Sequence, residues 1–386
     1  MGGGLGLGRG IRAGSSCFGF SSGASSAMTT CIAMLLLLLC QLLCLRCAEG
    51  TVGINYGQVA DNLPQPQHVS SLVQQLGFKM VKIYDTNETI LNAFANTGTS
   101  VVVCVPNDEI ISLAVSEVAA RTWVHTNINP FFPATKITNI MVGNEILGGD
   151  PSIWPALVPA MWQLYSGLRY YNLDDNIKIS TPHPMGVLAT SYPPSAGTFQ
   201  PSIATSVMAP LLNFLDSTQS HFMVNVYPYF AYLADGGTHI SLNFALIEPN
   251  TTGFTDANTG LHYSCLLDAM LDATIYAMKS LNYSDIPLVI TESGWPSMGD
   301  PTEIGASATN AAIYNNNLIK HVNSQPPLGT PLRPGVAFDT YIFALFNEDL
   351  KPGPLSERHW GLFYPNMSQV YTVNVELDSQ ITTVSK

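Results

Sequence analysis

The chain has 386 residues, of which 46% are hydrophobic and only 11% charged, so it is long enough to bury a substantial core. It contains 27 acidic residues against 15 lysines and arginines, and its formal net charge at pH 7 is −12. An acidic chain without a basic cluster is a poor binder of nucleic acid or of an anionic membrane surface. The composition therefore excludes these two classes of partner and favours a globular domain.

The first 48 residues differ from the rest of the chain, because they contain no aspartate or glutamate. Residues 33–45 (AMLLLLLCQLLCL) carry no charge, and Arg9 and Arg12 precede them. This length is typical of the apolar core of a secretory signal peptide and is short for a membrane-spanning helix. We predict a signal peptide and leader over residues 1–48, one domain over residues 49–386, secretion to the cell exterior or cell wall, and no stable membrane anchor. A retained signal anchor is the alternative.

The cysteines and histidines do not indicate a metal or cofactor. Five of the seven cysteines lie in the leader, and the two that remain, Cys104 and Cys265, are too few for a disulfide framework, a zinc site or a redox motif. The eight histidines show neither an HExxH motif nor paired ligand spacing. We therefore expect no metal and no cofactor. Four sequons that permit glycosylation begin at Asn87, Asn250, Asn282 and Asn366.

Short β-rich runs alternate with helix-like segments after residue 50. Apolar and β-branched residues predict eight strands, at residues 51–57, 79–85, 100–106, 137–145, 177–184, 221–230, 287–293 and 338–346. Apolar residues at helical spacing predict five helices, at residues 66–76, 110–125, 154–171, 265–281 and 308–321. Near-continuous apolar strands separated by helices are typical of parallel strands that are covered on both faces.

Eight such repeats over about 300 residues predict a (β/α)₈ TIM barrel. A doubly wound open sheet is the alternative, but Gly53 and Gly57 in the first strand lack the spacing of a dinucleotide-binding loop. The segment 231–264 is long and rich in glycine, asparagine and threonine. We expect it to form an insertion at the barrel mouth, as a small subdomain near the C-terminal end of the sixth strand.

Two glutamates stand where buried strands end. Glu145 follows the apolar run 140–142, and Glu292 follows the run 288–290. Burial favours the protonated form of a carboxyl group, and two carboxyls in different environments can divide the roles of acid and nucleophile. Because the fourth and seventh strands of a barrel face each other across the mouth, the pair suits glycoside hydrolysis. The alternative is that each glutamate caps a helix or binds a loop amide.

Aromatic residues near the strand ends are candidates to stack on sugar rings. We predict sugar contacts for Tyr56, Tyr84, Tyr227 and Trp295, with Tyr227 and Trp295 favoured because of their strand-end positions. The alternative for each is a place in the core of the barrel or its helices.

Several motifs occur in order along the chain: GINYGQ (53–58), YD (84–85), VGNE (142–145), NVYPYFA (225–231), TESGWPS (291–297), and NEDLKPGP (347–354) with ERHWGLF (357–363). With these motifs, residues 51–365 resemble the plant glycoside hydrolase family 17 endo-1,3-β-glucanases. The co-linear set is far more specific than any single motif.

The resemblance implies a retaining enzyme that cleaves β-1,3-glucan internally, with a catalytic core over about residues 51–365. It implies that Glu145 is the general acid and base, Glu292 the nucleophile and Asn144 the contact to the sugar 2-hydroxyl. It also implies that a charged cluster of Glu348, Lys351 and Glu357 supports the nucleophile and the groove.

The glucan linkage that the enzyme cleaves is the property that the resemblance defines least. The segments 126–134 and 231–264 differ from the family's pattern, and the cysteine-rich carbohydrate-binding module of many relatives has no counterpart after residue 365. A β-1,3-1,4-glucanase, a glucan transglycosylase and a catalytically inactive glycan-binding protein are the alternatives. We expect a monomer whose partner is a β-1,3-glucan polysaccharide resembling callose or laminarin.

Overall fold

The computed structural model describes Met1 and residues 50–375. The predicted signal peptide therefore lies almost wholly outside the described residues. Within the described part of the chain, no helix combines the length and the apolar character that crossing a bilayer requires.

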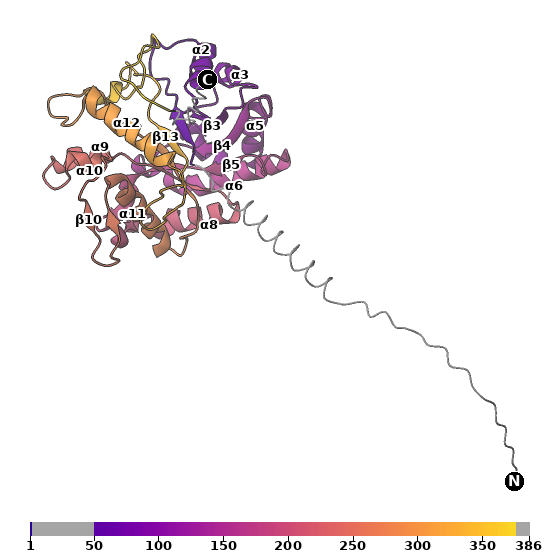
Figure 1. Cartoon of the computed structure of the whole chain (residues 1–386). Helices are drawn as coiled ribbons and strands as arrows, with labels where there is room; N and C mark the ends of the chain where they lie inside the picture. The colour runs from indigo at the N-terminus through magenta and orange to yellow at the C-terminus, as the bar shows by residue number, and fades with distance from the viewer. Residues whose placement is uncertain (2–49, 376–386) are drawn as a thin grey trace, which may run out of the picture. The chain divides into compact units, whose positions relative to one another are not determined.

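A parallel β-sheet forms the centre of the fold (Figure 1). Its strands are β1 (Val52–Asn55), β2 (Met80–Lys82), β3 (Ser100–Val105), β4 (Lys136–Val142), β5 (Lys178–Ser180), β6 (Pro182–Pro184), β9 (Phe222–Asn225), β12 (Leu288–Ser293) and β13 (Thr340–Ile342). The strand order is β5-β4-β3-β2-β1-β13-β12-β9-β6. Only Thr181 separates β5 from β6, the two ends of this order, so the chain itself closes the ring into eight strand positions. The predicted (β/α)₈ barrel is confirmed, and the open doubly wound sheet is wrong.

Helices surround the barrel (Figure 1). They are α2 (Pro66–Gln75), α3 (Glu88–Ala93), α4 (Ile110–Ala114), α5 (Glu117–Asn127), α6 (Trp154–Tyr170), α7 (Pro201–Ile203), α8 (Ala209–Ser217), α11 (Leu266–Ser280) and α12 (Ala308–Val322). The helix predicted over residues 110–125 is divided into α4 and α5, because Ser116 leaves the helical conformation and its side chain caps α5 by accepting the Ala119 N–H. The periodicity missed the short helix α3 and the helix α8.

Two β-hairpins and two short helices add to the barrel. The sixth predicted strand ends earlier than expected, since β9 stops at Asn225 and Pro228 begins α9 (Pro228–Asp235). The predicted insertion follows as α10 (Leu242–Ala245) and an antiparallel hairpin of β10 (Phe254–Thr255) and β11 (His262–Tyr263). A second hairpin, which the sequence did not reveal, joins β7 (Leu188–Thr190) to β8 (Thr198–Phe199).

The barrel interior is filled by its own small cluster of side chains. Its buried members are Met80, Val102, Cys104, Met141, Met223 and Tyr341. The intervening residues, such as Val81 and Val103, belong instead to the larger core that includes the buried faces of the helices. This alternation is the period of two that a strand imposes on its side chains. It also directs Lys82, two residues beyond Met80, into the barrel toward the carboxyl ends of the strands.

Candidate active site

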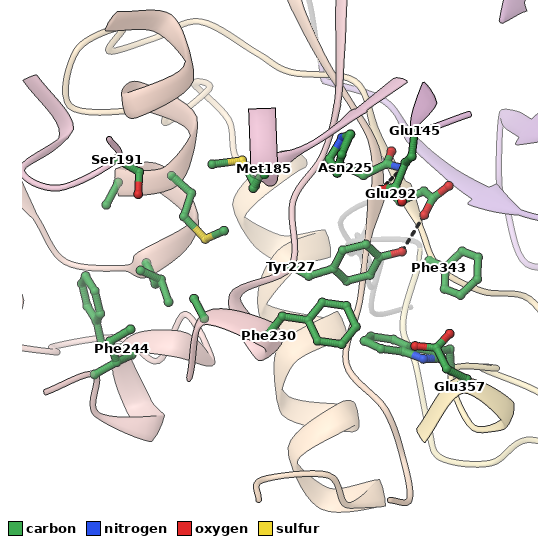
Figure 2. Close-up of a pocket in the computed structure, with 18 of the residues that line it drawn as sticks. Glu145, Met185, Ser191, Asn225, Tyr227, Phe230, Phe244, Glu292, Phe343 and Glu357 are labelled. Atoms are coloured by element: carbon green, nitrogen blue, oxygen red, sulfur yellow. Dashed lines mark hydrogen bonds between the residues drawn. The ribbon is translucent and has the colours of Figure 1, made fainter. Parts of the chain in front are cut away.

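The carboxyl ends of the strands open into a cleft of about 1890 Å³. Glu145, Asn225 and Glu292 lie together in this cleft, with the ring of Tyr227 beside them (Figure 2). Small-molecule pockets usually measure about 300–1,000 Å³. The cleft is therefore large enough for several sugar units and not only for one.

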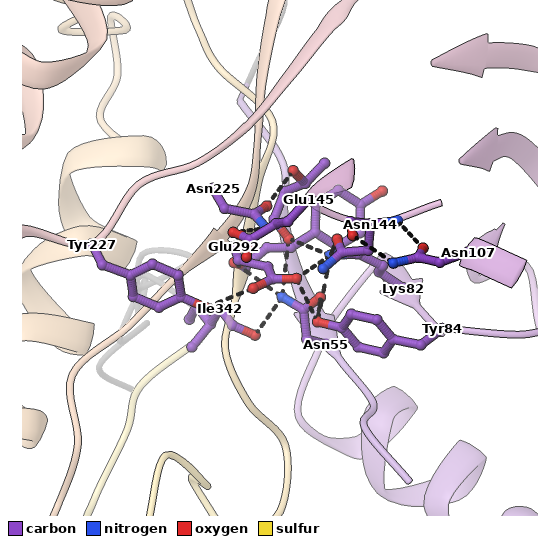
Figure 3. A network of polar contacts seen from close by, with 12 residues as sticks. Asn55, Lys82, Tyr84, Asn107, Asn144, Glu145, Asn225, Tyr227, Glu292 and Ile342 are labelled. Atoms are coloured by element: carbon purple, nitrogen blue, oxygen red, sulfur yellow. Dashed lines mark hydrogen bonds and ion pairs between the residues drawn. The ribbon is translucent and has the colours of Figure 1, made fainter. Parts of the chain in front are cut away.

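Glu292 is held by hydrogen bonds on both carboxylate oxygens (Figure 3). It lies near the end of β12 and is only 6% exposed. Its Oε1 accepts hydrogen bonds from Lys82 Nζ at 2.5 Å and from the Tyr84 hydroxyl at 2.8 Å. Its Oε2 accepts one from the Tyr227 hydroxyl at 2.7 Å. Three donors on one carboxylate fix its orientation.

The ion pair between Lys82 and Glu292 compensates a charge that would otherwise be costly to bury. The Lys82 side chain is completely buried, and its ammonium also contacts the Thr291 carbonyl at 3.4 Å and the face of the Tyr84 ring. Burial, and then the charge of Glu292, raises the pKa of the Tyr84 and Tyr227 hydroxyls well above their usual value. Both tyrosines therefore stay protonated and remain donors.

The pKa of Glu292 lies below its usual value. Burial is the largest influence and alone would raise the pKa. The charge of Lys82 outweighs it, together with the hydrogen bonds from Lys82, Tyr227 and Tyr84. Glu292 is thus ionised near neutral pH, as a nucleophile must be.

Glu145 follows β4 in an unusual backbone conformation. Its φ of 56° and ψ of 33° place it in the left-handed region, which a non-glycine residue rarely adopts. Its N–H donates to the Pro182 carbonyl at the start of β6 at 3.0 Å. Its Oε1 accepts a hydrogen bond from Asn225 Nδ2 at 2.9 Å. These contacts aim the side chain across the barrel mouth.

The pKa of Glu145 is raised, opposite to that of Glu292. Burial is the main cause, and the negative charge of Glu292 is the second. The hydrogen bond from Asn225 opposes the shift but does not reverse it. Of the two carboxyls, Glu145 is therefore the one that keeps its proton to the higher pH.

Asn225 connects the two glutamates. It is the register partner of Glu292 between β9 and β12, and its amide donates to Glu145. Its Oδ1 accepts a hydrogen bond from Thr291 Oγ1 at 2.7 Å, which fixes the amide orientation. The site thus brings together two glutamates that lie 147 positions apart in the printed sequence.

Asn144 lines the cleft beside Glu145. Its N–H donates to Asn107 Oδ1 at 2.9 Å, and its carbonyl accepts from Asn107 Nδ2 at 3.2 Å. Its own Oδ1 lies 3.5 Å from Lys82 Nζ. The backbone clamp by Asn107 leaves the Asn144 side chain to face the cleft (Figure 3).

Glu348, Lys351 and Glu357 form one charged cluster on the cleft wall. Lys351 Nζ lies 3.8 Å from Glu348 Oε2 and 3.9 Å from Glu357 Oε2. Glu348 Oε1 also accepts the Val59 N–H at 2.9 Å. A Cβ at Gly57 would meet the Glu348 carboxylate, so a larger residue there would push that side chain aside. Burial raises the pKa of both glutamates, and the ammonium of Lys351 opposes that shift.

Two of the four predicted aromatic contacts require correction. Trp295 has no exposed surface, packs against Tyr229 and Tyr314, and donates its indole N–H to the Gly305 carbonyl at 2.8 Å. Tyr56 is 2% exposed and packs edge-on against Phe346. Neither lines the cleft, so both belong to the core. Tyr84 and Tyr227 do line it, with their hydroxyls on Glu292.

The sequence reasoning missed Lys82 as a member of the site. The signal was present: Lys82 lies between the apolar residues Val81 and Ile83 of the run KMVKIYD, on the same strand face as Met80. A lysine inside a buried strand needs a counter-ion. Among the residues that the structure describes, no cluster of three His, Cys, Asp or Glu side chains is arranged to hold a metal ion.

The chain is similar to known glycoside hydrolases. The model for glycosyl hydrolases family 17 matches residues 52–375. The chain is 43% identical over 329 residues to glucan endo-1,3-beta-glucosidase 3 of Arabidopsis thaliana, which covers 85% of this chain and 65% of the relative. It is 42% identical over 353 residues to glucan endo-1,3-beta-glucosidase 11 of the same plant, which covers 91% of this chain and 82% of the relative.

A solved structure is similar over the same region. CJP38, described as a beta-1,3-glucanase and allergen of Cryptomeria japonica pollen, matches with a TM-score of 0.80 and 45% identity over 85% of this chain and 100% of that one. The chain spans slightly less than two thirds of the length of some relatives that it matches. The match over residues 52–375 nevertheless covers most of the chain, which therefore belongs to glycosyl hydrolases family 17.

Proposed function

We propose that the protein hydrolyses internal β-1,3-glucosidic linkages of β-1,3-glucans with retention of configuration. The observation that carries the proposal is the opposite displacement of two carboxyl pKa values in one cleft. The pKa of Glu145 is raised by burial and by Glu292, whereas that of Glu292 is lowered because Lys82 and two tyrosine hydroxyls outweigh burial. Two carboxyl groups in one site, of which one keeps its proton to a higher pH than the other, suit the acid and nucleophile roles of a retaining glycosidase.

In the first step, Glu145 donates its proton to the glycosidic oxygen while Glu292 attacks the anomeric carbon. The bond to the leaving sugar breaks and a covalent glycosyl-enzyme forms. Lys82, Tyr84 and Tyr227 hold the attacking carboxylate so that it does not need to reorganise during attack.

In the second step, Glu145 acts as a base. Once Glu292 is esterified, it no longer carries the negative charge that raises the pKa of Glu145. The pKa of Glu145 therefore falls, and its carboxylate accepts a proton from the water that attacks the anomeric carbon. Hydrolysis restores the charge on Glu292 and with it the protonated state of Glu145.

The substrate assignment rests on the relatives and on the size of the cleft. The Arabidopsis relatives carry the name glucan endo-1,3-beta-glucosidase, and the Cryptomeria protein is described as a beta-1,3-glucanase. A cleft of about 1890 Å³ suits a segment of polymer more than a single sugar. We assign Asn144 as the contact to the sugar 2-hydroxyl, and the cluster of Glu348, Lys351 and Glu357 as support for the nucleophile and the groove.

We further propose a secreted monomer. The uncharged run at residues 33–45 supports export, since it has the length of a signal-peptide apolar core. Expression of the full chain in a secreting eukaryotic cell tests both points: the medium should contain the protein without its leader, at the mass of one chain by light scattering. Retention in the cell membrane would identify a signal anchor.

The purified protein should release reducing ends from curdlan and laminarin. Proton NMR at early times should show the β-anomer of the new reducing end, because two displacements retain configuration. An α-anomer would overturn the retaining mechanism. Preferential cleavage of mixed 1,3-1,4 glucan would favour a β-1,3-1,4-glucanase. Products longer than the substrate would favour a transglycosylase, and glucan binding without any cleavage would favour an inactive glycan-binding protein.

A further inference from the structure

Two hairpins from different parts of the chain build the end of the cleft that lies away from the glutamates. The β7–β8 hairpin contributes Ser191 and Tyr192, and the insertion contributes Phe244 and Phe254. Ser191 and Phe244 lie on the side of the cleft opposite to Glu357 (Figure 2). Because the same cleft reaches both ends, a polymer held at the glutamates can extend to this remote end.

Asp256 locks the two hairpins together. It is 1% exposed and lies just after β10 in the insertion. Its Oδ2 accepts the Ser195 N–H and its Oδ1 accepts the Ser195 hydroxyl, both at 2.9 Å, across 61 positions of the chain. Asn258 Nδ2 donates to Ser195 Oγ at 3.0 Å from the same loop. The remote end is therefore preorganised before a ligand arrives.

Tyr192 presents an aromatic ring at this end. Its side chain is 71% exposed, and its ring centroid lies 5.2 Å from that of Phe254. Phe254 in turn stacks on the fully buried Tyr263 at 5.4 Å and packs against Phe244 at 6.0 Å. The exposed ring thus rests on a buried aromatic stack that restricts its motion.

The surroundings of Tyr192 are polar but nearly uncharged. The residues that line the cleft here offer hydroxyl and amide groups, from Ser191, Asn243, Asn250, Thr251 and Thr252. Among the described residues that line this end, His239 is the one basic side chain, and its ring lies 2.9 Å from Asp235. A flat apolar ring beside neutral hydrogen-bonding groups matches a pyranose, which has apolar C–H faces and a rim of hydroxyls.

We propose that Tyr192, supported by Phe254, is a platform that binds a glucose unit of the glucan chain remote from the bond that is cleaved. This inference rests on the proposed function for its substrate. The platform gives binding energy to long chains only, because a short oligosaccharide held at Glu145 and Glu292 does not reach it.

Replacing Tyr192 should therefore produce a loss that depends on chain length. Because a single aromatic contact contributes only modestly to binding, Tyr192→Ala should lower kcat/KM about 3- to 10-fold for long laminari-oligosaccharides and leave the shortest cleaved one unchanged. The loss should lie in KM, since the contact is equal in the ground and transition states. Tyr192→Trp should restore activity on long chains.

Tyr170→Ala is the matched control. Tyr170 is 58% exposed and packs under Arg121 outside the cleft, so its removal should leave all chain lengths unaffected. Equal losses on short and long chains after Tyr192→Ala, or no loss on either, would overturn the platform.

A binding measurement separates the platform from the proposed function. In the Glu145→Gln background, calorimetry should show that Tyr192→Ala weakens a β-1,3-linked glucose hexamer about 3- to 10-fold. If Glu145→Gln and Glu145→Gln/Tyr192→Ala bind the hexamer with equal affinity, Tyr192 is not a sugar-binding platform. If the wild-type protein cleaves no glucan, the proposed function fails, and this titration still decides whether Tyr192 binds sugar.

Discussion

The ends of β4 and β12 carry the same residue type and give it opposite properties. Glu292, at the end of β12, is held by a buried ammonium and two tyrosine hydroxyls. Glu145, just after β4, accepts one hydrogen bond, from the neutral Asn225 amide. Burial alone would raise the pKa of both carboxyls, but only Glu292 has a cation in direct contact, and its pKa is lowered as a result. The comparison teaches that the partner charges, and not the burial, assign the roles of acid and nucleophile.

The first way to break this comparison is to neutralise Glu292. Glu292→Gln should lower kcat at least about 10³-fold, because an amide cannot form the glycosyl-enzyme. It should also cost about 3–5 kcal/mol in the free energy of unfolding, since it leaves Lys82 buried without a counter-ion. Urea unfolding and glucan hydrolysis measure the two effects.

The double variant Lys82→Met/Glu292→Gln serves as the control. It removes the uncompensated cation, so it should recover much of the stability while remaining inactive. A double variant no more stable than Glu292→Gln would show that the ion pair does not explain the loss.

Neutralising Glu145 tests the other half of the comparison. Glu145→Gln should lower kcat on laminarin about 10²–10⁴-fold, because general acid catalysis is lost. Its stability should change little, as no buried cation depends on it. This variant should still form the glycosyl-enzyme much faster from an aryl glycoside of β-1,3-linked glucose than from laminarin, because the aryl leaving group needs no proton. Equal losses on both substrates would argue against Glu145 as the acid.

Removing one donor from Glu292 should have a smaller effect. Tyr227→Phe deletes a hydrogen bond to a charged group, which contributes about 1.5–3 kcal/mol, and we expect a loss in kcat/KM of about 10- to 150-fold. Tyr56→Phe is the matched control: Tyr56 is buried in the larger core and does not line the cleft, so its substitution should leave activity unchanged. A comparable loss for Tyr56→Phe would restore that residue to the site.

The pH dependence of kcat/KM tests the difference in pKa between the two glutamates. Activity requires Glu292 ionised and Glu145 protonated, so the profile of kcat/KM should be bell-shaped. It should fall as pH drops through the lowered pKa of Glu292, and fall as pH rises through the raised pKa of Glu145. Tyr227→Phe should move the acidic limb upward, because it removes a hydrogen bond that stabilises the ionised form. An unmoved acidic limb would assign that limb to another group.

Much of the fold could be predicted because its signals are local. The apolar runs and their spacing predicted eight strand positions, and the run 177–184 contains both β5 and β6, which close the ring. The hairpins at the remote end of the cleft were harder to predict from the sequence. The β7–β8 hairpin has strands of only three and two residues, too short for an apolar alternation to stand out.

The aromatic residues show where sequence position misleads. Trp295 follows a strand end directly, which predicted exposure to the cleft. The chain instead turns its indole into a pocket of Tyr229 and Tyr314, where the Gly305 carbonyl accepts its N–H. Tyr192, in the β7–β8 hairpin whose short strands gave no sequence signal, is 71% exposed and lines the cleft.

The sequence by itself determined the barrel, the two strand-end glutamates and the family motifs, because each depends on residues close together in the chain. Only the tertiary structure decided which glutamate has the lower pKa. Lys82 is 210 positions from Glu292, and Tyr84 and Tyr227 are 208 and 65 positions from it. A pKa depends on charges within a few ångströms. The barrel places those charges there by closing the sheet, which no local pattern records.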